Sequence, residues 1–297
     1  MDLSLWLPAN RPWNELHDLA MRAEQRGWHG IWLADHFMTN TPEPNSEPMG
    51  ECLAQLAALA AVVPRVRLGS LVLGNTYRHP AVVAKTAAAI DEICQGRFVL
   101  GIGAGWQVNE HTAYGIELGS VRERLAWFAE ACEVITRLRS GEPVTFDGTR
   151  YQLRDASLSP GPVGSLPLLI GASGERTMPR IVAAYADEWN TWATPDVFAH
   201  KSAVMSRACE ARDRDPATLR RTTQALIFIG ADGAEKAAAS GRPAIGGTTS
   251  QLTDIVGEYR DAGVDEFIVS TFGKRSVAEI DEFAEQFWTE IAAPLRS

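Results

Sequence analysis

Short apolar runs alternate with longer segments of helical periodicity along the whole chain. The short runs are rich in Val, Ile, Leu and aromatic residues and predict eight β-strands, at residues 3–7, 30–34, 66–73, 97–101, 166–170, 188–192, 222–229 and 266–271. The longer segments predict helices at residues 12–26, 51–62, 81–93, 121–139, 176–185, 195–212, 250–262 and 277–291. Strand-then-helix units imply parallel strands with helical crossovers, so the pattern predicts an α/β fold, a closed (β/α)8 TIM barrel. A doubly wound open sheet is the alternative.

Three segments rich in Pro and Gly interrupt this pattern, at residues 40–48, 141–165 and 239–249. We interpret them as insertions rather than linkers, so residues 1–297 are expected to form a single domain of a length that suits one barrel. Long loops in a compact domain are often lids or binding loops. All three are therefore expected at the rim of a pocket on the carboxyl face.

Composition and charge narrow the classes of partner. The net charge is −9 and the 28 basic residues are scattered, which argues against a nucleic-acid or anionic-membrane surface. The cysteines, Cys52, Cys94, Cys132 and Cys209, form no C-x-x-C pair and are expected to be buried free thiols in a reducing compartment. No apolar run reaches the ~20 residues that span a bilayer. The first residues read as a strand rather than a secretion signal, so we expect a cytoplasmic enzyme.

Unusual polar residues follow the predicted strands, where barrel enzymes carry their chemistry. Asp35 and His36 follow the second strand and form the first candidate for an acid–base pair, because an imidazole titrates near neutrality. Glu110 and His111, beyond the fourth strand, form a second candidate pair. The sequence does not decide whether His36 or His111 supplies a proton.

The turn after the fifth strand is a candidate anion site. Its small residues let backbone N–H groups approach a ligand, the next helix adds the positive end of its dipole, and hydroxyl and guanidinium groups can donate. The residues concerned are Gly171, Ala172, Ser173, Gly174, Arg176 and Thr177. A plain turn capped by Ser173 is the alternative interpretation.

Other known site patterns are missing from the sequence. Gly101, Gly103 and Gly105 do not make a dinucleotide fingerprint, because Trp106 stands where its last glycine would be and the unit is the fourth, not the first. We interpret these glycines as room for a flat ring, or its side chain, against the backbone. No Walker loop, H-E-x-x-H or G-x-S-x-G pattern occurs, so neither a metal site nor a serine nucleophile is expected.

Taken in order, several segments resemble the luciferase-like monooxygenase superfamily and, within it, the oxidoreductases that depend on coenzyme F420. These segments are residues 30–37, 67–70, 77–80, 96–106, 110–111, 114–115, 169–171 and 262–267. The resemblance covers nearly the whole chain and implies a flavin or 5-deazaflavin at the carboxyl ends of the strands. The preference for coenzyme F420 over FMN rests on this resemblance, since the residues alone do not separate the two.

The resemblance also implies roles for single residues. A non-prolyl cis peptide at Leu71–Val72, beside Ser70 and close to Gly74, is expected to support the middle ring of the cofactor. The remaining contacts with the ring and its side chain fall on Asp35, Ala104, Gly105, Trp106 and Asn109, and the phosphate contacts on Ser173, Gly174 and Thr177.

One departure bears on the substrate. In the sugar-phosphate dehydrogenase branch, a Glu acting as acid or base occupies the position of Trp106, and two lysines and an arginine of that branch have no counterpart here. We therefore expect a less polar pocket, with walls formed by Phe37, Tyr77, Trp106 and Trp192, and a substrate other than a sugar phosphate.

The predicted reaction is hydride transfer between coenzyme F420 and an unsaturated or carbonyl small molecule, with His36 as proton donor. The alternatives are an FMN-dependent monooxygenase and a non-catalytic flavin-binding protein. A homodimer is expected, because the family commonly pairs through barrel helices.

Overall fold

Eight parallel strands close into a barrel in this computed structural model, which describes residues 1–40, 47–274 and 276–295. Each strand pairs with the next, and the last pairs with the first, so the sheet closes. The barrel strands are β1 (Asp2–Leu7), β2 (Gly30–Leu33), β3 (Arg67–Ser70), β5 (Phe98–Gly103), β8 (Leu168–Gly171), β9 (Glu188–Trp192), β10 (Arg220–Ile229) and β12 (Glu266–Ser270). The predicted barrel is confirmed, and the open-sheet alternative is wrong.

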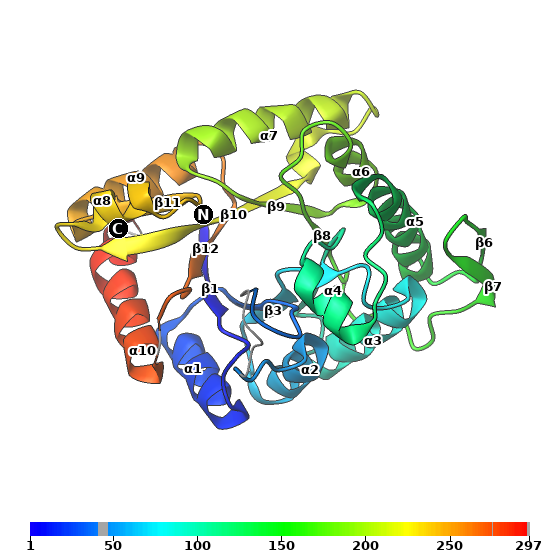
Figure 1. The fold of residues 1–297 in the computed structure, drawn as a ribbon, viewed down its shortest axis with the longest axis horizontal. Helices are drawn as coiled ribbons and strands as arrows, with labels where there is room; N and C mark the ends of the chain where they lie inside the picture. The colour runs from blue at the N-terminus through cyan, green and yellow to red at the C-terminus, as the bar shows by residue number, and fades with distance from the viewer. Residues whose placement is uncertain (41–46, 275, 296–297) are drawn as a thin grey trace.

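Helices surround the strands in an outer ring (Figure 1). They are α1 (Trp13–Arg26), α2 (Cys52–Val62), α3 (Pro80–Ile93), α5 (Val121–Arg139), α6 (Met178–Tyr185), α7 (Pro195–Glu210), α9 (Thr249–Asp261) and α10 (Val277–Gln286). Each corresponds to a predicted helix. The last predicted helix continues past α10 as a π-helical segment, η2 (Phe287–Ala292), before the short η3 (Ala293–Leu295). The main core lies between this ring and the outer face of the sheet.

Several elements were not predicted. They are β4 (Leu73–Gly74), α4 (Val108–Tyr114), β6 (Val144–Asp147), β7 (Gln152–Ala156), the short η1 (Pro216–Thr218), α8 (Gly233–Ala239) and β11 (Ala244–Gly247). The interpretation of residues 141–165 and 239–249 as long loops is wrong in part, because both ranges contain strands. The first range contains the β6–β7 hairpin, which projects beside α5 in Figure 1, and the second contains β11. Of the third predicted loop, residues 41–46 lie outside the described residues.

The β11 strand exists because β10 is longer than the barrel needs. The first half of β10 pairs with β9 and β12, and its second half, from Leu226 to Ile229, pairs with β11 in parallel. A short segment such as β11 becomes a strand through these partners rather than through its own composition, and sequence periodicity does not contain that information.

The barrel interior is layered, with charged groups at the amino end. Arg67 donates to Glu266 at 2.7 Å and also pairs with Glu188, and Arg220 donates to Glu266 at 3.2 Å. Above them lies an apolar layer, consisting of Trp32, Leu71, Val99, Leu169 and Ile268. The amino end of the barrel is thus occupied by ion pairs and the middle by packed side chains. In the described part of the chain these two layers fill the amino end and the middle, so a ligand is expected at the carboxyl end, as in other barrels of this class.

Candidate functional site

A cis peptide bond interrupts the third barrel strand at the carboxyl face. It joins Leu71 and Val72, neither of which is proline, and lies between β3 and the short β4, which resumes the pairing with β5. The cis peptide expected at this position is therefore confirmed. The bulge that it forms brings Val72 and Gly74 to the mouth of the barrel, where a planar ligand could lie on the backbone.

Three glycines make room for this bulge. A Cβ atom added at Gly101 would lie 1.9 Å from the Ser70 carbonyl oxygen, and one at Gly103 or Gly171 would lie 2.9 or 3.0 Å from a methyl of Val72. The interpretation of Gly101 and Gly103 as room for a cofactor ring is wrong, because the protein's own strand fills that space. Ser70 is likewise used internally, since its hydroxyl donates to the Gly101 carbonyl at 2.7 Å.

Asp35 is a buried structural anchor. Arg78 donates to both of its carboxylate oxygens, at 2.8 and 2.9 Å, and the Gly74 amide donates to it at 3.0 Å. Arg78 also pairs with Glu51. Burial opposes the charge of Arg78, but its bonds to these carboxylates outweigh burial and raise its pKa. The expected Asp35–His36 acid–base pair does not form, because Asp35 is held by Arg78 and Gly74.

The partner of His36 is Glu110, which follows β5. Glu110 is fully buried, and its Oε1 accepts from His36 Nδ1 at 2.8 Å and from the Tyr77 hydroxyl, while its Oε2 accepts from the Phe37 amide at 2.7 Å. Burial works against ionisation, but these hydrogen bonds lower the pKa of Glu110 below that of an ordinary glutamate. Burial and the adjacent carboxylate raise the pKa of Tyr77. Glu110 is therefore an ionised carboxylate that accepts hydrogen bonds from three donors.

The other ring nitrogen of His36 is free for a ligand. Its Nε2 has no hydrogen-bond partner among the described residues, and 26% of the side chain is exposed. Trp106 lies edge-on to the imidazole, with ring centroids 5.6 Å apart, and is itself 54% exposed. A fixed imidazole with one free nitrogen beside an exposed indole is an arrangement suited to proton transfer.

His111 has no free nitrogen. Its Nδ1 lies 2.6 Å from the Gln107 carbonyl oxygen and its Nε2 lies 2.7 Å from the Thr76 hydroxyl, and the side chain is buried. The expected Glu110–His111 pair therefore does not form. Of the two histidines that the sequence left open, the geometry favours His36.

Phe37 and Tyr77 belong to an aromatic stack beneath α4. The Phe37 ring lies 4.6 Å from that of Tyr77 and 5.0 Å from that of Tyr114, and Tyr77 also packs on His111. This stack holds α4, and with it Glu110, against the strand ends. The two residues were expected as pocket walls. Their packing makes them supports of the His36–Glu110 pair.

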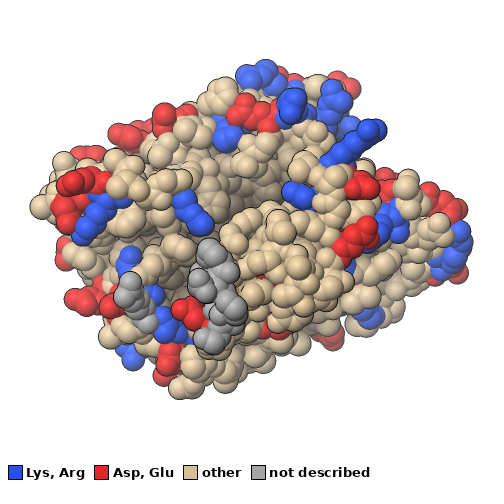
Figure 2. All heavy atoms as spheres, in the orientation of Figure 1, with Lys and Arg blue, Asp and Glu red and all other residues tan. Residues whose placement is uncertain are grey.

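The half of the mouth opposite the bulge is lined by tryptophan and amide side chains. Trp192 and Trp6 make an edge-to-face pair with centroids 5.5 Å apart. Asn190 Nδ2 donates to the Thr222 hydroxyl at 2.8 Å and to Gln224 Oε1 at 2.7 Å. Figure 2 shows this face with a central depression of uncharged atoms. Asn190 and Trp192 stand out in the sequence at the end of their strand, whereas Trp6 and Gln224 do not.

The turn between β8 and α6 was predicted to offer backbone amides and side-chain donors to an anion, and the structure leaves only some of these groups available. The Ala172 amide is bonded to the Asn190 carbonyl and is not available to a ligand. The rest of the turn is exposed, including Ser173, Gly174, Arg176 and Thr177. Ser173 does not cap α6, because its N-cap is Thr177, whose side chain makes no capping hydrogen bond.

A lysine that sequence reasoning missed also reaches this turn. Lys201, from α7, donates to the Ser173 carbonyl at 2.7 Å and to Glu175 at 3.0 Å. Its charge is paired with Glu175 and lies at the Ser173 end of the turn. Because α7 is distant in the sequence, only the fold brings this residue to the site.

Three further residues predicted to contact the cofactor follow β5: Ala104 and Gly105 precede α4, and Asn109 lies in its first turn. Ala104 is half-buried, and Gly105 has a positive φ of 84° with Thr76 packed closely against it. The Asn109 amide is used inside the protein, since its Nδ2 donates to the Thr39 carbonyl and its Oδ1 accepts from the Glu110 amide. Asn109 therefore holds Glu110 in place, in addition to any contact it makes with a ligand.

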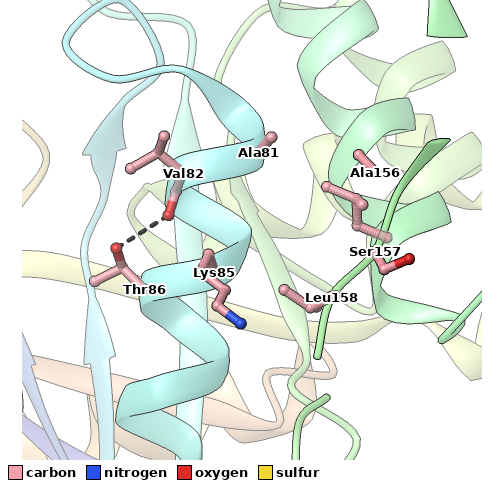
Figure 3. A pocket seen from close by; sticks show the side chains of 8 residues that line it. Ala81, Val82, Lys85, Thr86, Ala156, Ser157 and Leu158 are labelled. Atoms are coloured by element: carbon pink, nitrogen blue, oxygen red, sulfur yellow. Dashed lines mark hydrogen bonds between the residues drawn. The ribbon is translucent and has the colours of Figure 1, made fainter. Parts of the chain in front are cut away.

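The described residues offer few other kinds of site. In residues 1–40, 47–274 and 276–295 no group of His, Cys, Asp and Glu could hold a metal ion, and no helix is long and apolar enough to span a bilayer. The four cysteines are buried and unpaired, as expected. A groove of about 300 Å³ lies on the outside of the barrel, between α3 and residues 156–158 (Figure 3). Its lining carries no acid–base pair.

Proteins with similar sequences are described as enzymes that use coenzyme F420. The chain is 38% identical over 191 residues to an F420-dependent glucose-6-phosphate dehydrogenase of Microbacterium testaceum, a match that covers 63% of this chain and 56% of the relative. A protein of Kineococcus radiotolerans with the same description is 38% identical over 161 residues, covering 54% and 47%. The chain thus spans about half the length of the curated relatives it matches.

Solved structures resemble the whole barrel. An F420-dependent secondary alcohol dehydrogenase in complex with an F420–acetone adduct aligns with a TM-score of 0.84 and 20% identity, over 99% of both chains. The coenzyme F420-dependent tetrahydromethanopterin reductase of Methanopyrus kandleri aligns with a TM-score of 0.81 and 17% identity, also over 99% of both. At these identities the likeness shows the fold. A family model described as luciferase-like monooxygenase matches residues 1–279, and the chain belongs to this family.

Proposed function

We propose that the protein is an oxidoreductase that binds coenzyme F420 across its barrel mouth and exchanges a hydride with a small molecule bearing a carbonyl or an unsaturated bond, with His36 as the proton donor. The observation that carries the proposal is the His36–Glu110 pair. It holds an imidazole at the end of β2 with Nε2 free. The descriptions of the relatives support the choice of cofactor.

The residues present fit such a cofactor at two places. The bulge at Leu71–Val72 offers backbone at the mouth for a planar ring. The exposed turn of Ser173, Gly174 and Thr177, with Lys201 beside it, offers hydroxyls and a cation to a phosphate. Reduced coenzyme F420 supplies a hydride and reacts poorly with oxygen.

The proton is handled by the protein. When a carbonyl carbon gains a hydride, the C=O π pair moves onto oxygen, and that oxygen takes the proton of His36 Nε2–H to give the alcohol. Glu110 bonds Nδ1, so the transferable proton of the imidazolium sits on Nε2, and the neutral ring accepts a proton at the same atom in the reverse reaction. Glu110 orients the ring as the carboxylate of a catalytic triad does.

Spectroscopic titration tests the cofactor. We expect the absorbance of coenzyme F420 to shift on addition of protein, with micromolar affinity, and reduced F420 to be oxidised when a ketone is added. Tight binding of FMN without binding of F420, accompanied by oxygen consumption with reduced FMN, would overturn the proposal and favour a monooxygenase. Unchanged turnover in His36→Asn would move the proton donor elsewhere.

A further inference from the structure

The half of the barrel mouth away from the bulge has a hydrogen-bonding pattern that is incomplete within the protein. The bulge and its glycines occupy β3, β5 and β8, whereas β9, β10, β12 and β1 form the other half in the closed order of strands. This second half is the space that a ring lying on the bulge leaves for a substrate. Its interior side chains decide what can bind there.

Two buried amides lie at the base of this half. Both donors of Asn190 Nδ2 are used, on Thr222 and on Gln224 Oε1. Asn190 Oδ1 and Gln224 Nε2 have no partner among the described residues, although both side chains are at least 97% buried, with exposed fractions of 3% and 2%. Both atoms lack a hydrogen-bond partner but are not fully excluded from solvent. Each therefore borders space that water can enter. Two neighbouring side chains therefore leave one acceptor and one amide donor without a partner among the described residues.

The surroundings of these amides are uncharged. Gln224 is in register with Trp192, and Trp6 is in register with Ser270. The two indoles pack on each other at this level and supply apolar faces. The charged groups nearest along the strands, Glu188 and Glu266, lie toward the amino end and are already paired with Arg67. A ligand with a negative charge would find no cation at the amides and would lose its hydration.

We propose that the substrate is an uncharged ring compound with two oxygens: the reacting carbonyl, which lies at His36, and a hydroxyl at the far end, which donates to Asn190 Oδ1 and accepts from Gln224 Nε2. A hydroxyl has one donor and accepting lone pairs, so it completes both free amide groups at once. Trp6 and Trp192 pack against the apolar body. The placement of the reacting carbonyl at His36 rests on the proposed function, whereas recognition of the far hydroxyl by the two amides does not.

The test compares three probes of one ring: 4-hydroxycyclohexanone, cyclohexanone and 4-oxocyclohexanecarboxylate. Binding to the protein without cofactor is followed by saturation-transfer NMR, and turnover by oxidation of reduced F420. We expect the hydroxyketone to bind about tenfold more tightly than cyclohexanone, because two neutral hydrogen bonds are added, and the carboxylate to bind more weakly than either. The same order is expected in kcat/KM.

Gln224→Met keeps the size of the side chain and removes the donor, so the preference for the hydroxyketone should fall to about twofold or less. Gln224→Glu removes the same donor but keeps an acceptor for Asn190. It replaces Gln224→Met in this test if that variant does not fold. Gln152→Met, at an exposed position of the β6–β7 hairpin, is the matched control and should keep the full preference.

The outcomes separate the two proposals. A hydroxyl preference below twofold in the wild type, or one that survives in Gln224→Met, overturns the inference even if F420 turnover is robust. A preference that is present in NMR and lost in Gln224→Met supports it, even if F420 does not bind and the proposed function falls.

Discussion

Glu110 and His36 share a hydrogen bond of 2.8 Å although they lie 74 residues apart in the chain. His36 follows β2 and Glu110 lies on α4, so the pair exists only because the barrel brings the ends of β2 and β5 to one face. A buried carboxylate that orients an imidazole defines which nitrogen can exchange a proton.

Glu110→Gln should slow turnover with F420 by about a hundredfold in kcat and change KM little, because the imidazole loses its orienting anion but the substrate contacts remain. Steady-state kinetics across a range of pH would measure the effect, and the pH profile should change shape. Glu142→Gln, at an exposed site before β6, is the matched control. A kcat for Glu110→Gln within threefold of wild type would contradict a role for the pair.

Tyr77→Phe removes one of the three donors to Glu110. We expect a loss of about tenfold in kcat, because a hydrogen bond to a charged group is stronger than a neutral one. The effect should nearly disappear in the Glu110→Gln background, since a double-mutant cycle reports the coupling of the two residues. Additive losses would instead assign Tyr77 a role of its own.

Folding stability should depend on pH through Glu110. The pKa of Glu110 in the folded protein lies below the 4.5 of an ordinary glutamate, so the folded state favours its ionised form. This contribution to the free energy of unfolding is fully present above pH 4.5 and is lost as pH falls through the folded pKa. Urea unfolding at pH 6 and pH 3.5 should show a smaller drop for Glu110→Gln than for wild type. Glu142→Gln should show the wild-type drop.

Asp35→Asn should destabilise the protein by about 3 kcal/mol, since Arg78 would keep a buried charge without its bidentate partner. The loop that begins at Gly74 would also lose its anchor, so F420 affinity should fall. Chemical unfolding and cofactor titration measure the two effects. Asp261→Asn, at the exposed end of α9, should change neither. A stable variant with normal F420 affinity would show that Asp35 is dispensable.

Lys201→Met should weaken F420 binding about fivefold, and the loss should shrink in high salt, because the lysine acts on the phosphate through its charge. A deazaflavin that lacks the phosphate should bind wild type and variant equally. Lys236→Met, on exposed α8, removes a lysine away from the turn and serves as the control. Equal losses for both deazaflavins would place the effect in the fold of the turn rather than in phosphate binding.

The sequence predicted the barrel well because strand and helix periodicities are local properties. It failed for the partners of Asp35 and His36, because adjacency in a loop says nothing about where two side chains point. The glycines at 101 and 103 were misread for a related reason. What fills the space beside a strand comes from the neighbouring strand, in this case Val72. The cis peptide was expected only because a family resemblance supplied it.

The ion pairs of Arg67, Glu188, Arg220 and Glu266 have a consequence for the order of events in turnover. In the described part of the chain they occupy the amino end of the barrel, so a ligand bound at the mouth would enter and leave by the carboxyl end. A ring lying on the bulge would cover one half of the barrel mouth and leave the half lined by Asn190 and Gln224 open. Substrate and product could then exchange past a resident cofactor, and the kinetics would show the cofactor binding first and departing last.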